Sequence, residues 1–143
     1  MATIEGNLFI NAPIETVWEY VTQINSIPDW FEGVKSVKSD DDVLSLGTAM
    51  DVTYGVAGQD IEMEVKTIEF IPGQLIVQST KGMLSAETHY QYKSEGDGTR
   101  VTAHSDYQIS GGLLGKLAEQ VVKSALNSNK EKTLQNLKSQ CEG

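Results

Sequence analysis

The chain has 143 residues, of which 39% are hydrophobic and 22% are charged, and this balance excludes collagen-like, disordered and membrane-spanning classes. Its 20 acidic and 11 basic side chains give a formal net charge of -9, which repels phosphate backbones and anionic lipid heads. We therefore expect one domain over residues 1–143, with no nucleic-acid partner and no stable membrane association.

The cysteine content and the N-terminal segment favour a cytoplasmic location. Cys141 is the only cysteine and lies two residues from the C-terminus, so no internal disulfide can form. The first residues have neither a basic start nor an apolar run of the kind that targeting segments show. We expect an exposed Cys141 thiol without special chemistry.

The N-terminal third predicts one strand and two short helices. Side chains alternate over residues 3–11, which is typical of a half-buried strand. Asn11 and Pro13 are residue types that start a helix, and Asn11 is the predicted N-cap. Apolar residues at helical spacing continue over residues 14–21, and a second short helical segment is expected over residues 24–31.

After Gly33 the sequence favours β-strands separated by turn residues. Between residues 59 and 70 the apolar side chains change from odd-numbered to even-numbered positions, which predicts a bulge near Lys66 and Thr67. The acidic run at residues 40–42 is interpreted as a solvated loop, with calcium binding as the weaker alternative. The expected strands cover residues 34–39, 48–56, 59–70, 74–80, 85–94 and 99–109.

The last two strands flank Glu95-Gly96-Asp97-Gly98, which has the composition of a tight turn. A loop centred on Gly96 and Asp97 pairs residues whose numbers sum to 193, whereas an Asp97-Gly98 turn gives a sum of 195. Both registers leave each side chain on the same face. His89 and His104 fall on the outer face, and the inner face carries Thr88, Tyr90, Tyr92, Ser105 and Tyr107.

A long amphipathic pattern predicts a C-terminal helix from about Leu113 to Lys138. Its predicted apolar stripe includes Val121, Ala125 and Leu126, while small or polar residues occupy the middle of the helix. Small residues at the middle of a helix that crosses a curved sheet leave space beneath it. The sequence therefore predicts a cavity under this helix.

The order of elements and four local segments resemble the START-like superfamily, also called SRPBCC, and within it the polyketide cyclase/dehydrase-like group. The resemblance covers about residues 3–138, and the segments that carry it are Asn11-Ala12-Pro13-Ile14-Glu15-Thr16-Val17-Trp18, Pro28-Asp29-Trp30, Gly98-Thr99-Arg100-Val101-Thr102 and Gly111-Gly112-Leu113-Leu114-Gly115. It implies an α+β helix-grip fold, in which a curved antiparallel sheet of about 6–7 strands wraps around the C-terminal helix and encloses a largely apolar cavity. Two short helices follow the first strand.

Few residues have the chemistry that catalysis needs. His89 and His104 have acidic neighbours and could hold a divalent metal weakly, but a polar surface pair is the favoured interpretation, and no metal site is predicted. Phosphate-loop, paired-cysteine and nucleophile-elbow motifs are absent from the sequence, so we predict no cofactor. Tyr90, Ser105 and Tyr107 are weak catalytic candidates, because a hydroxyl can act as a general acid.

The candidate ligand-binding residues combine aromatic, sulfur-containing and hydroxyl side chains. A tyrosine can bury its ring while its hydroxyl orients a polar group of a ligand, although a core tyrosine bonded to backbone is the simpler interpretation of each one alone. The predicted set is Trp30, Phe31, Met50, Tyr54, Met63, Met83, Thr88, Tyr90, Tyr92, Ser105, Tyr107, Val121, Ala125 and Asn129.

These observations favour binding, and possible transport, of a small hydrophobic or aromatic molecule between the sheet and the C-terminal helix. The resemblance permits an alternative, a polyketide cyclase/dehydratase-type enzyme that uses tyrosine and serine hydroxyls in the same cavity. It also permits a co-chaperone-like interaction module, but the polar outward residues of the strand at 59–70 disfavour the exposed apolar patch that such a module needs. We expect a monomer or weak homodimer.

Overall fold

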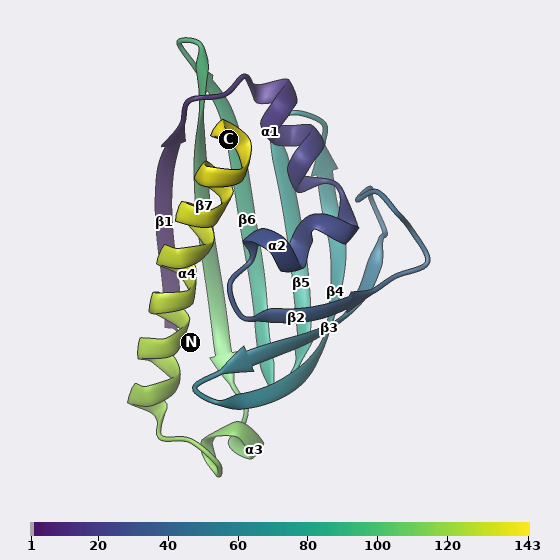
Figure 1. Cartoon of the computed structure of the whole chain (residues 1–143). Coiled ribbons are helices and arrows are strands. Elements are labelled where there is room, and N and C mark those ends of the chain that lie inside the picture. The colour runs from purple at the N-terminus through teal and green to yellow at the C-terminus, as the bar shows by residue number, and fades with distance from the viewer. Residues whose placement is uncertain (1) are drawn as a thin grey trace.

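Seven strands form one antiparallel sheet that curves around a long C-terminal helix in the computed structural model, which describes residues 2–143 (Figure 1). Neighbouring strands follow the order β1-β7-β6-β5-β4-β3-β2, so only the β1–β7 pair joins strands that are distant in sequence. This architecture confirms the predicted α+β helix-grip fold. The strands are β1 (Ala2–Ile10), β2 (Val34–Lys38), β3 (Ala49–Val56), β4 (Gln59–Ile71), β5 (Leu75–Gly82), β6 (Leu84–Glu95) and β7 (Gly98–Ile109).

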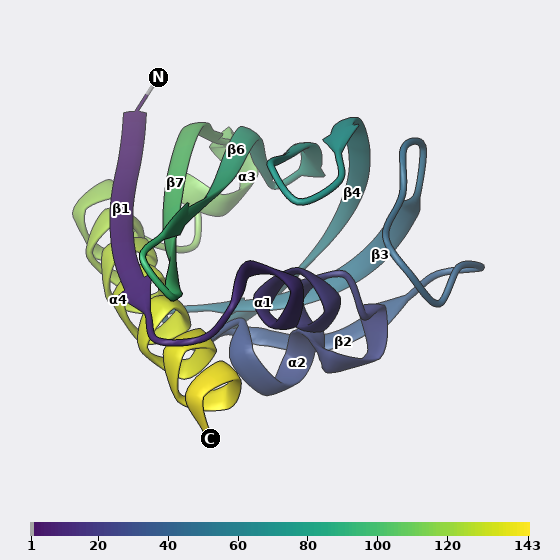
Figure 2. The ribbon, with the colours of Figure 1, turned by 90° about the horizontal axis from the view of Figure 1, so that it is seen from above.

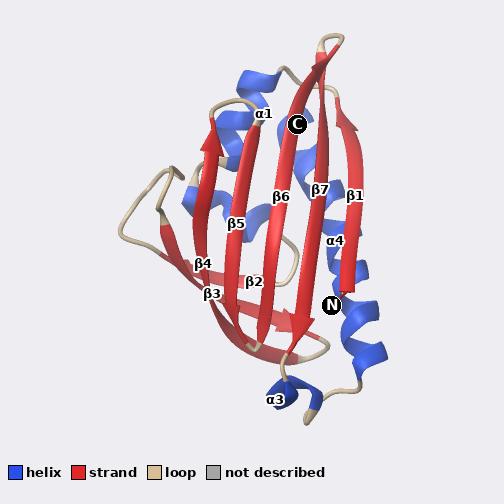
Figure 3. Cartoon of the chain, turned by 180° about the vertical axis from the view of Figure 1, so that it is seen from behind, coloured by secondary structure: helices blue, strands red, loops and turns tan. Residues whose placement is uncertain are grey.

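The helices lie on the concave side of the sheet, and the view from behind shows the convex face of β4 to β7 and β1 without a helix over it (Figure 3). Seen from above, α4 runs beside β1 on one flank and α2 lies beside β2 on the other (Figure 2). The helical elements are α1 (Ile14–Val21), the 3-10 turn η1 (Ile24–Ser26), α2 (Ile27–Trp30), α3 (Gly111–Leu114) and α4 (Glu119–Glu142). None of the helices within residues 2–143 is long and apolar enough to cross a membrane.

The β6–β7 hairpin has the first of the two predicted registers. Leu84 pairs with Ile109 and Glu95 pairs with Gly98, so the numbers of paired residues sum to 193. His89 lies opposite His104 on the outer face, as predicted. This register places alternate side chains of both long strands toward α4.

A bulge in β4 bends the sheet at the predicted place. Pairing with β5 shifts between Thr67 and Glu69, and the extra residue, Ile68, is exposed. After the bulge Phe70 faces inward and packs against Trp18, with ring centroids 5.3 Å apart. The bulge therefore returns an apolar side chain to the inner face after the buried Thr67.

The predicted N-cap of the first helix and the predicted continuity of the C-terminal helix are wrong. Pro13, and not Asn11, precedes the first residue of α1, and the Asn11 N–H instead donates to the Glu142 carboxylate at 2.7 Å. The predicted helix over residues 113–138 is divided into α3 and α4, because the backbone at Ala118 is extended, with φ -64° and ψ 146°. This break changes the rotation of α4, so that Val121 is 46% exposed although the stripe pattern placed it inside.

Polar side chains of α4 fasten the helix to the free edge of β1. Lys130 Nζ donates to the Glu5 carbonyl at 2.9 Å, and Lys138 Nζ donates to the Phe9 carbonyl at 3.2 Å. Gly6 provides the room, because a Cβ there would lie 2.8 Å from Lys130 Cδ. The contacts satisfy carbonyl groups that β1, an edge strand, cannot give to another strand.

Cys141 is half-buried against the core, so the expectation of an exposed thiol is wrong. Burial raises the pKa of the thiol to about 11, and the neighbouring Glu142 carboxylate adds to this effect. The cause is the last turn of α4, which places Cys141 against the core.

Replacing Gly98 by alanine should destabilise the fold, because a Cβ there would overlap the Phe9 ring and lie 2.6 Å from the Ile10 carbonyl oxygen. We expect Gly98→Ala to lower the free energy of unfolding by about 2 kcal/mol in urea denaturation. Gly111→Ala is the matched control, since nothing lies within 4 Å of its Cβ, and its effect should stay within about 0.5 kcal/mol. Equal effects of the two changes would contradict the packing at Gly98.

Alkylation of Cys141 by iodoacetamide should be slow in the folded protein, because the thiolate is the reacting species and the pKa is raised to about 11. Between about pH 7 and pH 9 we expect the urea-unfolded chain, whose thiol has an ordinary pKa of about 8.5, to react at least about tenfold faster. Mass spectrometry of timed samples measures both rates. Similar rates in the two states would show that the thiol is not buried.

Candidate functional site

A cavity of about 200 Å³ lies between the concave face of the sheet and α4. All seven strands contribute to its lining, because alternate side chains of each strand point inward. A dry cavity of roughly 150 Å³ accepts benzene, and sites for drug-sized ligands begin near about 300 Å³. The space therefore suits a molecule of one or two rings.

Aromatic side chains form one wall. The single turn of α2 places Trp30 beside Phe31, with ring centroids 5.6 Å apart, and Phe31 lies edge-on to Tyr54 of β3 at 6.4 Å. On the other side, Tyr92 of β6 lies edge-on to Trp18 of α1 at 5.2 Å. Because each ring packs against another ring, the wall has a defined shape.

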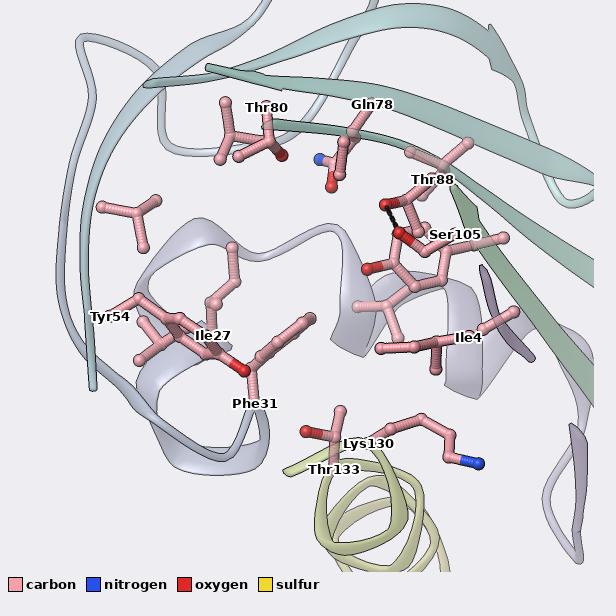
Figure 4. Close-up of a pocket in the computed structure, with 18 of the residues that line it drawn as sticks. Ile4, Ile27, Phe31, Tyr54, Gln78, Thr80, Thr88, Ser105, Lys130 and Thr133 are labelled. Atoms are coloured by element: carbon pink, nitrogen blue, oxygen red, sulfur yellow. Dashed lines mark hydrogen bonds between the residues drawn. The ribbon is translucent and has the colours of Figure 1, made fainter. Parts of the chain in front are cut away.

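Hydroxyl and amide groups lie on the sheet side of the cavity (Figure 4). The hydroxyls of Thr88 and Ser105 are 2.9 Å apart on the paired strands β6 and β7. One hydrogen joins the two oxygens, so the pair keeps a second hydrogen and free lone pairs for a ligand. Gln78 and Thr80 of β5 add an amide and a further hydroxyl to the same wall.

Two tyrosines of β6 keep their phenols neutral inside the cavity lining. Burial raises the pKa of Tyr90 far above its usual range, and the nearby Tyr54 phenol adds to the shift. Burial likewise raises the pKa of Tyr92, with Tyr90 as the next cause. Both groups are therefore hydrogen-bonding phenols, and neither is a phenolate, at physiological pH.

The α4 side presents little charge to the cavity. Lys130 lines the space with its aliphatic arm, while its Nζ donates to the Glu5 carbonyl and pairs with the Glu131 carboxylate at 2.9 Å. The Thr133 hydroxyl accepts a hydrogen bond from the Glu32 N–H at 2.9 Å, which ties α4 to the segment after α2. The Lys130 ammonium group is therefore directed to the contact between α4 and β1.

The structure brings most of the predicted ligand-binding residues together around this cavity. The lining contains every predicted residue of α2, of its C-cap and of the strands: Trp30, Phe31, Met50, Tyr54, Met63, Thr88, Tyr90, Tyr92, Ser105 and Tyr107. The structure places Met83, Val121, Ala125 and Asn129 outside the lining. Met83 lies in the turn before β6, where its Cε faces Gly112 of α3, and Val121 is exposed.

Several lining residues were not predicted, although the sequence contains signals for some of them. Gln78 and Thr80 share the parity of the buried Ile76, so strand alternation alone places them inside. Lys130 and Thr133 lie on the helical stripe that also contains Leu126, Leu134 and Leu137. Polar side chains on an apolar face are the signal that sequence reasoning overlooked.

The two histidines lie on the outer face, away from the cavity. His104 contacts the Glu5 carboxylate through Nδ1 at 2.9 Å and the Asp106 carboxylate through Nε2 at 3.2 Å. His89 Nε2 lies 3.1 Å from the Glu87 carboxylate. No group of three or more histidine, cysteine or acidic residues within residues 2–143 is arranged to hold a metal ion.

A curved sheet, a gripping C-terminal helix and an apolar cavity between them define the helix-grip class of proteins. The sequence matches the family described as polyketide cyclase / dehydrase and lipid transport over residues 1–142, and the chain belongs to this family. No curated protein matches the sequence significantly.

Solved structures with low sequence identity share the fold. Protein TTHA0849 from Thermus thermophilus is 18% identical, with a TM-score of 0.83 and coverage of 98% of this chain and 97% of that chain. The Zhui aromatase/cyclase from Streptomyces sp. R1128 is 15% identical, with a TM-score of 0.79 and coverage of 99% and 93%. Protein CV1439 from Chromobacterium violaceum is 14% identical, with a TM-score of 0.74 and coverage of 100% and 99%.

Proposed function

We propose that the protein binds a small, neutral, apolar or aromatic molecule of one or two rings in the cavity under α4. The observation that carries this proposal is the cavity of about 200 Å³, lined mainly by apolar and aromatic side chains. Burial of apolar surface supplies most of the affinity, at about 25 cal/mol per Å² before the cost of ordering the ligand. The hydroxyl groups of the lining set the orientation of the ligand.

The charge distribution supports a neutral ligand. Among residues 2–143, the lining contains one formally charged side chain, Lys130, and its ammonium is bonded to Glu5 and Glu131. An anionic ligand would lose its hydration without gaining a free cation, and a cationic ligand would meet no carboxylate of the described lining. If the protein transports such a molecule, the uncharged lining favours a neutral cargo for the same reason.

Filling the cavity should weaken binding without unfolding the protein. Ala103 of β7 lines the cavity, so we expect Ala103→Leu to weaken binding of naphthalene at least about tenfold in isothermal titration calorimetry. Thr102→Leu is the matched control, because Thr102 is exposed on the outer face, and it should leave the affinity unchanged. If both variants bind naphthalene as the wild type does, or if the wild type does not bind it, the cavity is not the binding site for such molecules.

A cyclase/dehydratase activity is the second candidate function, and the neutral phenols in the lining favour it. Tyr90 and Tyr107 line the cavity, and burial raises the pKa of both, so each hydroxyl stays protonated and can donate a hydrogen bond to a carbonyl oxygen or to a departing water. In such a reaction the walls would fold a flexible poly-carbonyl chain into a reactive conformation. The family description includes this class of enzyme.

Replacing Tyr90 or Tyr107 by phenylalanine separates the two candidate functions. A binding protein should lose only about twofold to tenfold in affinity, because one hydrogen bond is removed. An enzyme should lose at least about 100-fold in kcat on a poly-β-carbonyl substrate with KM nearly unchanged. The measurement is product formation followed by mass spectrometry beside ligand affinity on the same variants. No turnover by the wild type would exclude the enzyme for that substrate.

A further inference from the structure

The side-chain amide of Asn129 has a fixed orientation at the edge of the cavity. Its Nδ2 donates to the Gly55 carbonyl at 3.3 Å and to the Tyr54 hydroxyl at 3.0 Å. A carbonyl oxygen only accepts hydrogen bonds, so the amide NH₂, and not the amide oxygen, must face Gly55. The same NH₂ group then faces Tyr54, whose hydroxyl is the acceptor in this contact.

This arrangement leaves the hydrogen of the Tyr54 hydroxyl without a partner. A phenol has a single hydrogen, and the Asn129 amide occupies a lone pair of its oxygen. Among residues 2–143 the amide is the only hydrogen-bond partner of this hydroxyl. Tyr54 is 6% exposed and belongs to the cavity lining, so a bound ligand is the natural acceptor for the hydrogen.

The backbone around Gly33 holds this pair together. Gly33 has φ +94°, and a Cβ there would lie 2.7 Å from Tyr54 Cε1 and 2.9 Å from Asn129 Nδ2. The Gly55 N–H donates to the Gly33 carbonyl at 2.7 Å, which fixes the end of β3 beside the start of β2. Asn129 and Tyr54 can therefore pack closely only because this position has no side chain.

The hydroxyl pair and the amide on the opposite wall do not have a fixed polarity, although the indole N–H of Trp30, which also belongs to the lining, is a buried donor without a partner among residues 2–143. Thr88 and Ser105 can exchange donor and acceptor roles within their pair, and Gln78 carries both a donor and an acceptor. In the close-up, Tyr54 extends from the wall beside Phe31, on the side of the cavity away from Thr88 and Ser105 (Figure 4). Tyr54 also stays protonated, because burial raises its pKa more than the Asn129 hydrogen bond lowers it.

We propose that Asn129 is a positioning residue that makes the Tyr54 hydroxyl an obligate hydrogen-bond donor, and that the cavity thereby selects ligands with an acceptor such as a carbonyl oxygen at this end. The inference rests on the proposed binding function and adds the polarity that the ligand must have. Asn129 acts through Tyr54 and does not line the cavity itself.

Two probes that differ in one atom position test this inference. 2-Acetylnaphthalene presents a carbonyl oxygen, and 2-isopropenylnaphthalene has a CH₂ group in its place. We expect Tyr54→Phe to reduce the preference for the ketone over the alkene about fivefold relative to wild type. Because both probes are titrated against the same variant, partial loss of folded protein cancels in the ratio, and the comparison of variants isolates the contact with the carbonyl.

Asn129→Asp tests the positioning role directly. The new carboxylate accepts the hydrogen of Tyr54, so the hydroxyl turns its lone pairs to the cavity. We expect the ketone preference to fall about fivefold and binding of 2-naphthol, a hydrogen-bond donor, to become stronger. Asn127→Asp is the matched control, because the exposed Asn127 side chain contacts only the Lys123 carbonyl of its own helix, and it should keep the wild-type ratio.

The outcomes separate this inference from the proposed function. If the wild type binds neither naphthalene derivative, both are overturned. If it binds both but Tyr54→Phe leaves their ratio unchanged, only the role of Tyr54 is overturned. If Asn129→Asp weakens all three probes by the same factor, Asn129 has a merely structural role and the positioning inference is wrong.

Discussion

The fold depends on how α4 is held against a sheet that does not close on itself. Each flank of the helix reaches backbone groups that no strand satisfies. On one flank Lys130 and Lys138 donate hydrogen bonds to carbonyls of the β1 edge. On the opposite flank Asn129 donates to the Gly55 carbonyl and Asn136 donates to the Trp30 carbonyl. An unpaired backbone group that loses water costs free energy comparable to a lost hydrogen bond. These contacts therefore fix the height of α4 above the sheet as well as its position along it, and they cover an edge that could otherwise pair with another chain.

The cavity follows from the way these hydrogen bonds hold α4 at its two flanks. The helix is fastened at its sides, so the side chains beneath its middle need not fill the space down to the sheet. Small residues face this space on the central strands, with Ala86 on β6 and Ala103 on β7. Toward the C-terminal end of α4 the same sheet is packed closely, with Ile10 of β1 fully buried. An unfilled apolar space costs packing energy, so its persistence between well-packed regions supports the proposed binding function.

Strand periodicity made the sheet predictable from the sequence, whereas the helix and the polar contacts required tertiary information. Alternation fixes which face each residue of β6 and β7 occupies in either of the two registers that the turn allows, so Tyr90 and Ser105 could be placed inside, whereas the choice between the registers needed the structure. The break at Ala118 could not be predicted, because alanine is the best helix former and only its extended backbone in the fold separates α3 from α4. Asn129 was expected to contact the ligand, but its amide is satisfied by Tyr54 and Gly55, residues more than seventy positions away in sequence.

The net charge of -9 has its effect outside the cavity, and this limits how the proposed binding site would discriminate between ligands. Carboxylates such as Glu62 and Glu64 alternate with inward apolar residues of β4, so they lie in water where charge costs little. Inside, the raised pKa values of Tyr54, Tyr90 and Tyr92 preserve neutral phenols. A neutral interior cannot select ligands by charge, and it must select them by shape and by the direction of each hydrogen bond. In the proposed binding function the paired hydroxyls of Thr88 and Ser105 can reverse that direction, whereas the Tyr54 hydroxyl that the Asn129 amide holds as a donor cannot, so we infer that Tyr54 has the greater influence on which molecule fits.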